Sequence, residues 1–106
     1  MSASFDFMGQ SGSNYRFGIP ERLTFLPSGG HFMYARQTPQ GFEVLYLGET
    51  ENLSVGAERR WREAVETHGA SHLLVRLNTS GRIRRDEHDD MVRLYDPPMN
   101  HLESTR

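Results

Sequence analysis

Cysteine and lysine are both absent from the 106-residue chain, and no run of apolar residues approaches the length of a membrane span. Without cysteine the chain forms no disulfide and no thiolate metal site, so we expect it in the cytosol. A membrane span needs about 18 consecutive apolar residues, so no membrane partner is expected. The segment from Met1 to Asp6 also lacks the basic and apolar stretches of a signal peptide. These absences predict a soluble, cytoplasmic protein.

The charged residues are nearly balanced, because twelve arginines face fourteen acids and leave a formal net charge of −2. Nonspecific binding to nucleic acid neutralises several phosphates at once, and this composition does not favour it. The exclusive use of arginine has two explanations. It reflects a coding bias, or it reflects a need for guanidinium groups that bind phosphate or carboxylate with two hydrogen bonds. Composition alone leaves both open.

Five segments have the apolar patterns of β-strands. The first two alternate apolar and polar residues on either side of the turn-forming residues 9–14, which predicts an N-terminal hairpin. The third and fourth are joined by a turn at residues 38–41 and are the expected centre of the sheet. The predicted strands are residues 5–7, 15–17, 32–35, 42–47 and 72–77.

Two segments have helical periodicity. In residues 57–68 one apolar face recurs every three or four positions, and Gly69 follows where a left-handed helix end is expected. The second helix is predicted at residues 82–95, after the cap-forming residues 78–81 and before Pro97-Pro98. We therefore expect an α+β fold with a small, mainly antiparallel sheet flanked by helices.

The length suits a single domain. We expect an N-terminal hairpin and connecting segment in residues 1–28, a compact domain in residues 29–100 and a short tail in residues 101–106. The hairpin either extends the sheet or covers one of its edges.

The most specific motif lies on the two central strands. Gly30-His31-Phe32 begins the first strand, Tyr46-Leu47-Gly48 ends the second, and a polar segment with Leu53 follows. The last helix ends in Pro97-Pro98-Met99-Asn100. This pattern resembles the GIY-YIG nuclease family over about residues 29–100. The resemblance implies a GIY-YIG-like fold, and phosphodiester hydrolysis with a divalent metal.

The resemblance assigns roles to single positions. Tyr46 is similar to the family tyrosine that orients or deprotonates the attacking water, and Gly48 keeps a glycine at a close turn of the backbone. Gly30 and Asn100 also match the pattern. Phe32 keeps the ring of the first-motif tyrosine but lacks its hydroxyl.

Two charged positions of the family pattern are substituted. The arginine that stabilises charge on the phosphoryl oxygens corresponds to Gly56, so we expect Arg59 or Arg60 to replace it. The glutamate that binds the metal corresponds to His88, with Glu87 beside it as a second candidate ligand. An imidazole is a poor ligand for magnesium and suits zinc or manganese better.

Two functions are compatible with this partial match. In the first, which we favour, the chain is a catalytically degenerate GIY-YIG-fold domain that binds nucleic acid or another protein. In the second it is an endonuclease that hydrolyses DNA or RNA at a rearranged site. Tyr46 and Arg59 or Arg60 are then the catalytic residues, and His88 with Glu87 or Asp89 holds the metal. Magnesium, manganese or zinc is a cofactor in the second case only.

Overall fold

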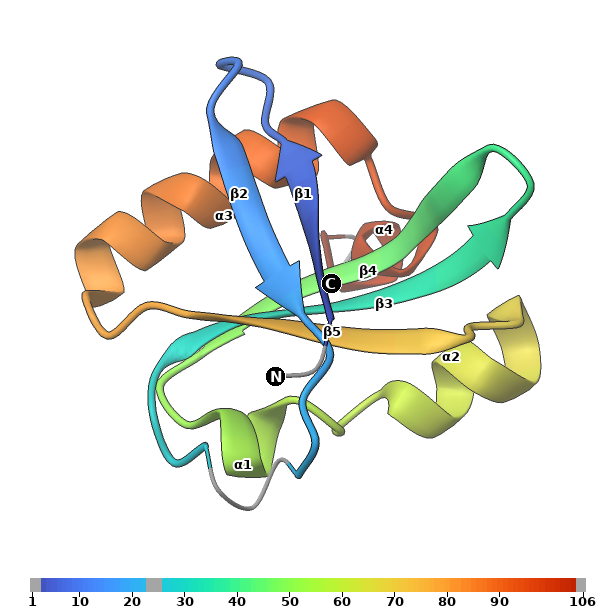
Figure 1. Cartoon of the computed structure of the whole chain (residues 1–106), viewed down its shortest axis with the longest axis horizontal. Coiled ribbons are helices and arrows are strands. Elements are labelled where there is room, and N and C mark those ends of the chain that lie inside the picture. Colours follow the sequence, from blue (N-terminus) through green and yellow to red (C-terminus); the bar gives the residue numbers. More distant parts are fainter. Residues whose placement is uncertain (1–2, 23–25, 105–106) are drawn as a thin grey trace.

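The computed structural model describes residues 3–22 and 26–104, with side chains as far as residue 101. Five strands form one curled antiparallel sheet in the order β1-β2-β5-β3-β4 (Figure 1). Their bounds are Ser4–Met8 (β1), Asn14–Gly18 (β2), Gly30–Thr38 (β3), Gly41–Thr50 (β4) and His72–Leu77 (β5). The α+β class and the antiparallel sheet are therefore as the sequence predicts.

The N-terminal hairpin extends the sheet. Strands β1 and β2 pair antiparallel, as expected, and β2 continues the sheet through one residue pair, Gly18 with Val75 of β5. The prediction that the third and fourth strands form the centre is half wrong. Strand β3 lies between β5 and β4, but β4 is an edge strand.

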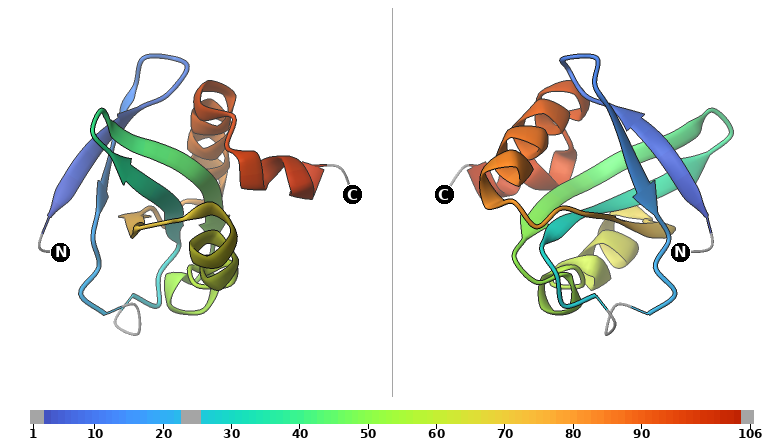
Figure 2. Two further views of the ribbon diagram at one scale, coloured as in Figure 1. Left: turned by 90° about the vertical axis from the view of Figure 1, so that its right-hand side faces the viewer. Right: turned by 60° about the vertical axis from the view of Figure 1, so that its left-hand side comes forward.

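The sheet curls until its two edge strands meet at one end. Phe5 of β1 contacts Phe42 of β4 edge to face, with ring centroids 4.9 Å apart. The hairpin accordingly crosses the β3–β4 pair at a steep angle (Figures 1 and 2). Inside this curl lies a core to which all five strands contribute, closed by Met91 of helix α3 (Gly81–Tyr95).

The other face of the sheet carries a second core, built on Phe32 and Tyr34. It is covered by three short helices: α1 (Leu53–Gly56), α2 (Trp61–His68) and α4 (Pro98–Ser104). The predicted helix over residues 57–68 is partly wrong, because residues 57–60 are turns between α1 and α2. Gly69 ends α2 in the left-handed conformation, with φ 73°, as its position predicts.

Helix α3 closely matches its prediction at both ends. Ser80 caps its N-terminus by accepting a hydrogen bond from the N–H of Ile83, and Asp96 ends it in the left-handed conformation. The chain then resumes as α4, which begins at Pro98, a residue well suited to a first helical turn. The expected tail from residue 101 is therefore helical as far as Ser104.

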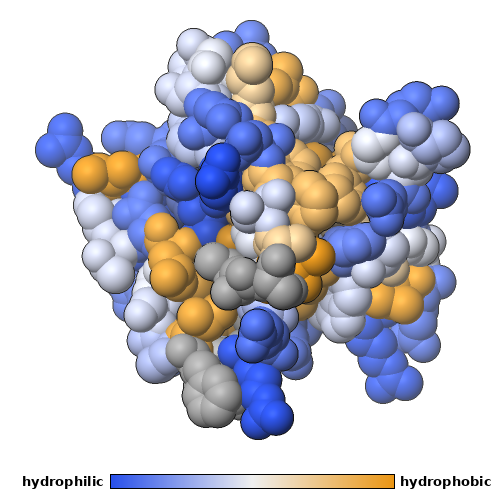
Figure 3. All heavy atoms as spheres, in the orientation of Figure 1, coloured by the Kyte–Doolittle hydropathy of each residue, from blue (hydrophilic) through white to orange (hydrophobic). Residues whose placement is uncertain are grey.

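On the face shown in Figure 3 hydrophilic residues predominate around a smaller group of apolar ones. In the part of the chain that the structure describes, no helix combines the length and apolarity required to cross a membrane.

Candidate functional site

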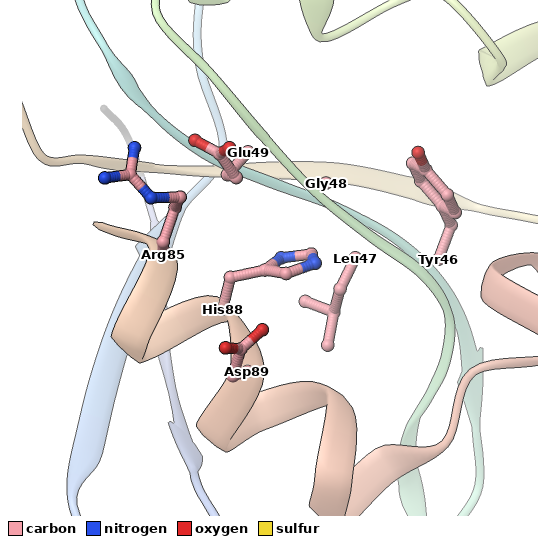
Figure 4. Close-up of a pocket in the computed structure, with 7 residues that line it drawn as sticks. All are labelled: Tyr46, Leu47, Gly48, Glu49, Arg85, His88 and Asp89. Carbon is pink, nitrogen blue, oxygen red and sulfur yellow. The ribbon is translucent and has the colours of Figure 1, made fainter. Parts of the chain in front are cut away.

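An open pocket of about 330 Å³ lies between the edge strand β4 and helix α3 (Figure 4). Four consecutive strand residues form one wall and three helix residues form the other. The lining residues are Tyr46, Leu47, Gly48, Glu49, Arg85, His88 and Asp89. The structure therefore brings together Tyr46, Gly48 and His88, three of the residues that the sequence singles out.

Gly48 gives the pocket its floor because no side chain fits there. A Cβ at this position would lie 2.2 Å from the ring of Phe32, which is directly opposite on β3. Phe32 thus packs against bare backbone. Because Phe32 has no hydroxyl, this contact beneath the pocket is purely apolar.

The strand wall also offers backbone groups. Leu47 directs its N–H and C=O away from β3, toward Asn100. Because this orientation repeats every second residue in an antiparallel pair, Glu49 directs its N–H and C=O to the same outer side. A bound group in the pocket therefore meets an N–H donor of the edge strand.

The helix wall carries one cation and one anion four residues apart. Arg85 and Asp89 lie on neighbouring turns of α3, and both are exposed. Neither forms an ion pair with any of the side chains described, which are those of residues 3–22 and 26–101. His88 lies between them, half-buried, with its ring directed across the pocket toward β4 (Figure 4).

The remaining carboxylate of the pocket, Glu49, is neutralised from behind. Its Oε2 accepts a hydrogen bond from Nε of Arg84, whose side chain is only 4% exposed. Arg84 also donates from Nη1 to the carbonyl of Asn78 at 3.1 Å. Arg84 therefore pairs with a residue of β4 and not with an acid of its own helix.

Glu87 does not line the pocket with His88. Its Oε1 accepts hydrogen bonds from Nδ2 of Asn78 at 2.9 Å and from Nε of Arg76 at 3.2 Å. Burial disfavours the charged carboxylate, but the hydrogen bonds from Arg76 and Asn78 outweigh it and lower the pKa of Glu87. The pair His88 and Glu87, expected to share a metal, is therefore divided between the two sides of α3.

His31 completes the Glu87 cluster, and the sequence gives no direct signal for it. It is fully buried, and its Nε2 lies 3.1 Å from Oε1 of Glu87. Desolvation lowers the pKa of His31 to about 4 despite the neighbouring carboxylate, so the ring is neutral and donates from Nε2. In the register of the sheet, His31 lies opposite both Arg76 of β5 and Glu49 of β4. This row of polar side chains across three strands can be recognised only when the strand pairing is known.

Tyr46 is held on both faces of its ring. Tyr34 stacks on one side with ring centroids 5.3 Å apart, and the guanidinium of Arg60 lies 5.0 Å from the ring centre. The side chain is 7% exposed, and its hydroxyl points away from His88 and Asp89 (Figure 4). Burial raises the pKa of the supporting Tyr34 to about 12, and its hydroxyl donates to the carbonyl of Ala57 at 2.8 Å.

The two arginines expected to replace the one missing at Gly56 do not line the pocket. Arg60 donates to both carboxylate oxygens of Glu63, at 3.0 and 2.9 Å, and to the carbonyl of Met99. Arg59 is exposed in the turns between α1 and α2. The cation that does line the pocket is Arg85, to which the motif assigns no role.

Gly56 and Gly30 are both required by close packing. A Cβ at Gly56 would lie 2.6 Å from Oγ1 of Thr50, and one at Gly30 would lie 2.4 Å from the carbonyl oxygen of Arg76. Position 56 is therefore closed to any side chain while Thr50 stays in place.

The residues present do not fit a magnesium centre. Within the ranges that the structure describes, no three histidine or carboxylate side chains are grouped to hold a metal ion. In the pocket itself Glu49 is committed to Arg84, which leaves Asp89 and an imidazole, the latter a poor magnesium ligand. We derive no metal-dependent step for this site.

Comparison of the chain with family models, with curated proteins and with solved structures gives no match.

Proposed function

We propose that this chain is a GIY-YIG-type domain that no longer cleaves phosphodiesters and binds nucleic acid by one backbone phosphate, in the pocket between β4 and α3. The observation that carries the proposal is Arg85, an arginine without an ion pair in the described ranges that lines an open pocket beside His88. A guanidinium presents a planar fork of donors that matches phosphate oxygens.

The surroundings of Arg85 support the binding of an anion. The buried guanidinium of Arg84 offsets the charge of Glu49, and the outward N–H of Glu49 supplies a neutral donor. The pocket volume of about 330 Å³ lies at the small end of ligand sites, which suits one phosphate group and part of its sugar.

Three arrangements support the proposal that cleavage is lost. The buried Tyr46 hydroxyl points away from the helix wall, so it does not face a water beside His88. Arg60 is held by Glu63 and by the Met99 carbonyl. Removal of one donor to a developing oxyanion typically costs on the order of 100-fold to 1,000-fold in rate, and here the tyrosine, the arginine and the metal carboxylate are all displaced or replaced.

The test is binding of a fluorescent single-stranded DNA at several salt concentrations. We expect the logarithm of affinity to fall with a slope near −0.7 per contacted phosphate, hence a shallow dependence for one or two contacts. Arg85→Ala should weaken binding by roughly tenfold to 150-fold, since a charge-assisted hydrogen bond contributes about 1.5 to 3 kcal/mol.

The matched control is Arg62→Ala, which removes the same charge from a side chain that is 90% exposed on α2. Equal losses in Arg85→Ala and Arg62→Ala would contradict a specific pocket. A plasmid-nicking assay with magnesium, manganese and zinc runs in parallel. Cleavage that disappears in Tyr46→Phe would replace our proposal with the endonuclease alternative.

A further inference from the structure

The charged side chains around the pocket are more selective than the binding of a phosphate alone would require. Arg85 supplies one positive charge, while Asp89 on the same wall and Glu49 on the opposite wall supply two carboxylates. Arg84 compensates Glu49 from within the protein, and no ion pair within the described ranges compensates Asp89. The net charge that faces a bound group is therefore close to zero.

We infer that Asp89 makes the pocket selective for phosphates with a single charge, an inference that rests on the proposed function. In a nucleic-acid strand these are the internal phosphodiesters. A terminal phosphate or a phosphorylated side chain carries about 1.5 to 2 negative charges near neutral pH. The first charge is matched by Arg85, but the second meets Asp89, and the cation beside Glu49, Arg84, is already paired with that carboxylate.

The position of Asp89 explains why it, and not a neighbouring acid, sets this selectivity. Asp89 is four residues from Arg85, so the two side chains emerge from adjacent turns on the pocket side of α3. Asp90 is turned to the hairpin, where it accepts hydrogen bonds from Ser11 and Tyr15. Asp86 is exposed on the same helix and does not line the pocket.

The size of the effect follows from the separation of the charges. Two like charges a few ångströms apart at a solvent-exposed surface repel each other, and this repulsion grows with the charge of the bound group. Asp89 should therefore disfavour a doubly charged phosphate by roughly fivefold to tenfold relative to a singly charged one. Arg84 acts as a positioning residue, since it holds Glu49 without lining the pocket.

The experiment compares two small probes by NMR titration of the whole chain. The first is a dinucleoside monophosphate, which has one phosphodiester, and the second is a nucleoside 5′-monophosphate, which has a doubly charged phosphate. The titration is run on the unmodified protein, on Asp89→Asn and on Asp86→Asn, which removes the same charge from the same helix.

We expect the unmodified protein and Asp86→Asn to prefer the diester by roughly fivefold or more, and Asp89→Asn to bind both probes alike. Equal binding of both probes to the unmodified protein would overturn the selectivity while leaving phosphate binding intact. An unchanged preference in Asp89→Asn would overturn the role of Asp89. If neither probe binds the unmodified protein, the proposed function itself fails, and the selectivity fails with it.

Discussion

The side chain of Asn100 pairs with the backbone of Leu47 as a neighbouring strand would. Its Oδ1 accepts from the Leu47 N–H at 2.9 Å, and its Nδ2 donates to the Leu47 carbonyl at 2.8 Å. Because β4 is an edge strand, these backbone groups would otherwise be open to pairing with another chain. Asn100 thus closes the edge beside the pocket, a structural role at the position where the family pattern ends.

Replacement of Asn100 should destabilise the fold. Asn100→Ala removes two hydrogen bonds from a half-buried backbone, and we expect the free energy of unfolding to fall by about 1 to 3 kcal/mol. Asn100→Asp keeps one acceptor but places an oxygen against the Leu47 carbonyl, so it should be no better. Chemical denaturation measures both, and the exposed Asn14→Ala serves as control. A stability equal to that of the unmodified protein would contradict this role.

Stability should fall in acid between pH 6.5 and about 4, because His31 is buried as a neutral ring. Its pKa is lowered from 6.5 to about 4, so in this interval the unfolded chain binds more protons than the folded one. The free energy of unfolding should therefore be highest, as far as His31 is concerned, above pH 6.5. It should fall by on the order of 3 kcal/mol as the pH is lowered to about 4. The lowered pKa of Glu87 adds a further loss below its ordinary value of 4.5.

The measurement is urea denaturation at a series of pH values. His31→Leu should flatten the part of the curve between pH 6.5 and 4, although it also loses the hydrogen bond to Glu87. His68→Gln, on the half-exposed end of α2, should follow the curve of the unmodified protein. An identical acid dependence in His31→Leu would show that another group is responsible.

An arginine introduced at position 56, where the GIY-YIG resemblance would place one, should destabilise the fold around Thr50. Gly56→Arg forces a Cβ against Thr50, and overpacking of this kind costs about 1 to 3 kcal/mol. Val55→Arg introduces the same residue one position earlier on α1, where the side chain is 69% exposed, and should be tolerated. Thermal unfolding separates the two variants. A Gly56→Arg protein with unchanged stability and new nicking activity would refute the closed packing described here.

Asp90 should hold the hairpin to helix α3. Its carboxylate accepts from the N–H of Ser11 at 2.8 Å, from the Ser11 hydroxyl at 2.7 Å and from the Tyr15 hydroxyl at 2.7 Å. Asp90→Ala should lower the free energy of unfolding by about 2 kcal/mol and raise hydrogen exchange in residues 9–13. Asp86→Ala is the control. Exchange that rises equally along the whole chain would argue against a local contact.

Local patterns in the sequence predict most of the elements. Alternation identifies the hairpin, and a short apolar run identifies β5. Cap chemistry identifies the start of α3 at Ser80 and the end of α2 at Gly69. The break between α1 and α2 is not predictable in this way, because it depends on Tyr34. The hydroxyl of Tyr34, from a distant strand, binds the carbonyl of Ala57 and the N–H of Arg60.

The candidate site is also predictable only in part, because it depends on contacts between residues that are far apart in the sequence. The motif leads to Tyr46, Gly48 and His88, since these have fixed spacings along the chain. Arg85 has no such place in the motif, because its role depends on which side of α3 faces the edge of β4. Likewise, Glu87 and His88 are adjacent in sequence, yet one binds His31 and the other lines the pocket.

The most direct test of phosphate binding at this pocket is an amide NMR titration with a dinucleoside monophosphate, performed on the unmodified protein and on Arg85→Ala. We predict shifts concentrated at Gly48, Glu49 and His88, which are lost in Arg85→Ala and kept in Arg62→Ala. Shifts elsewhere on the surface, or an unchanged titration in Arg85→Ala, would contradict the binding site proposed here.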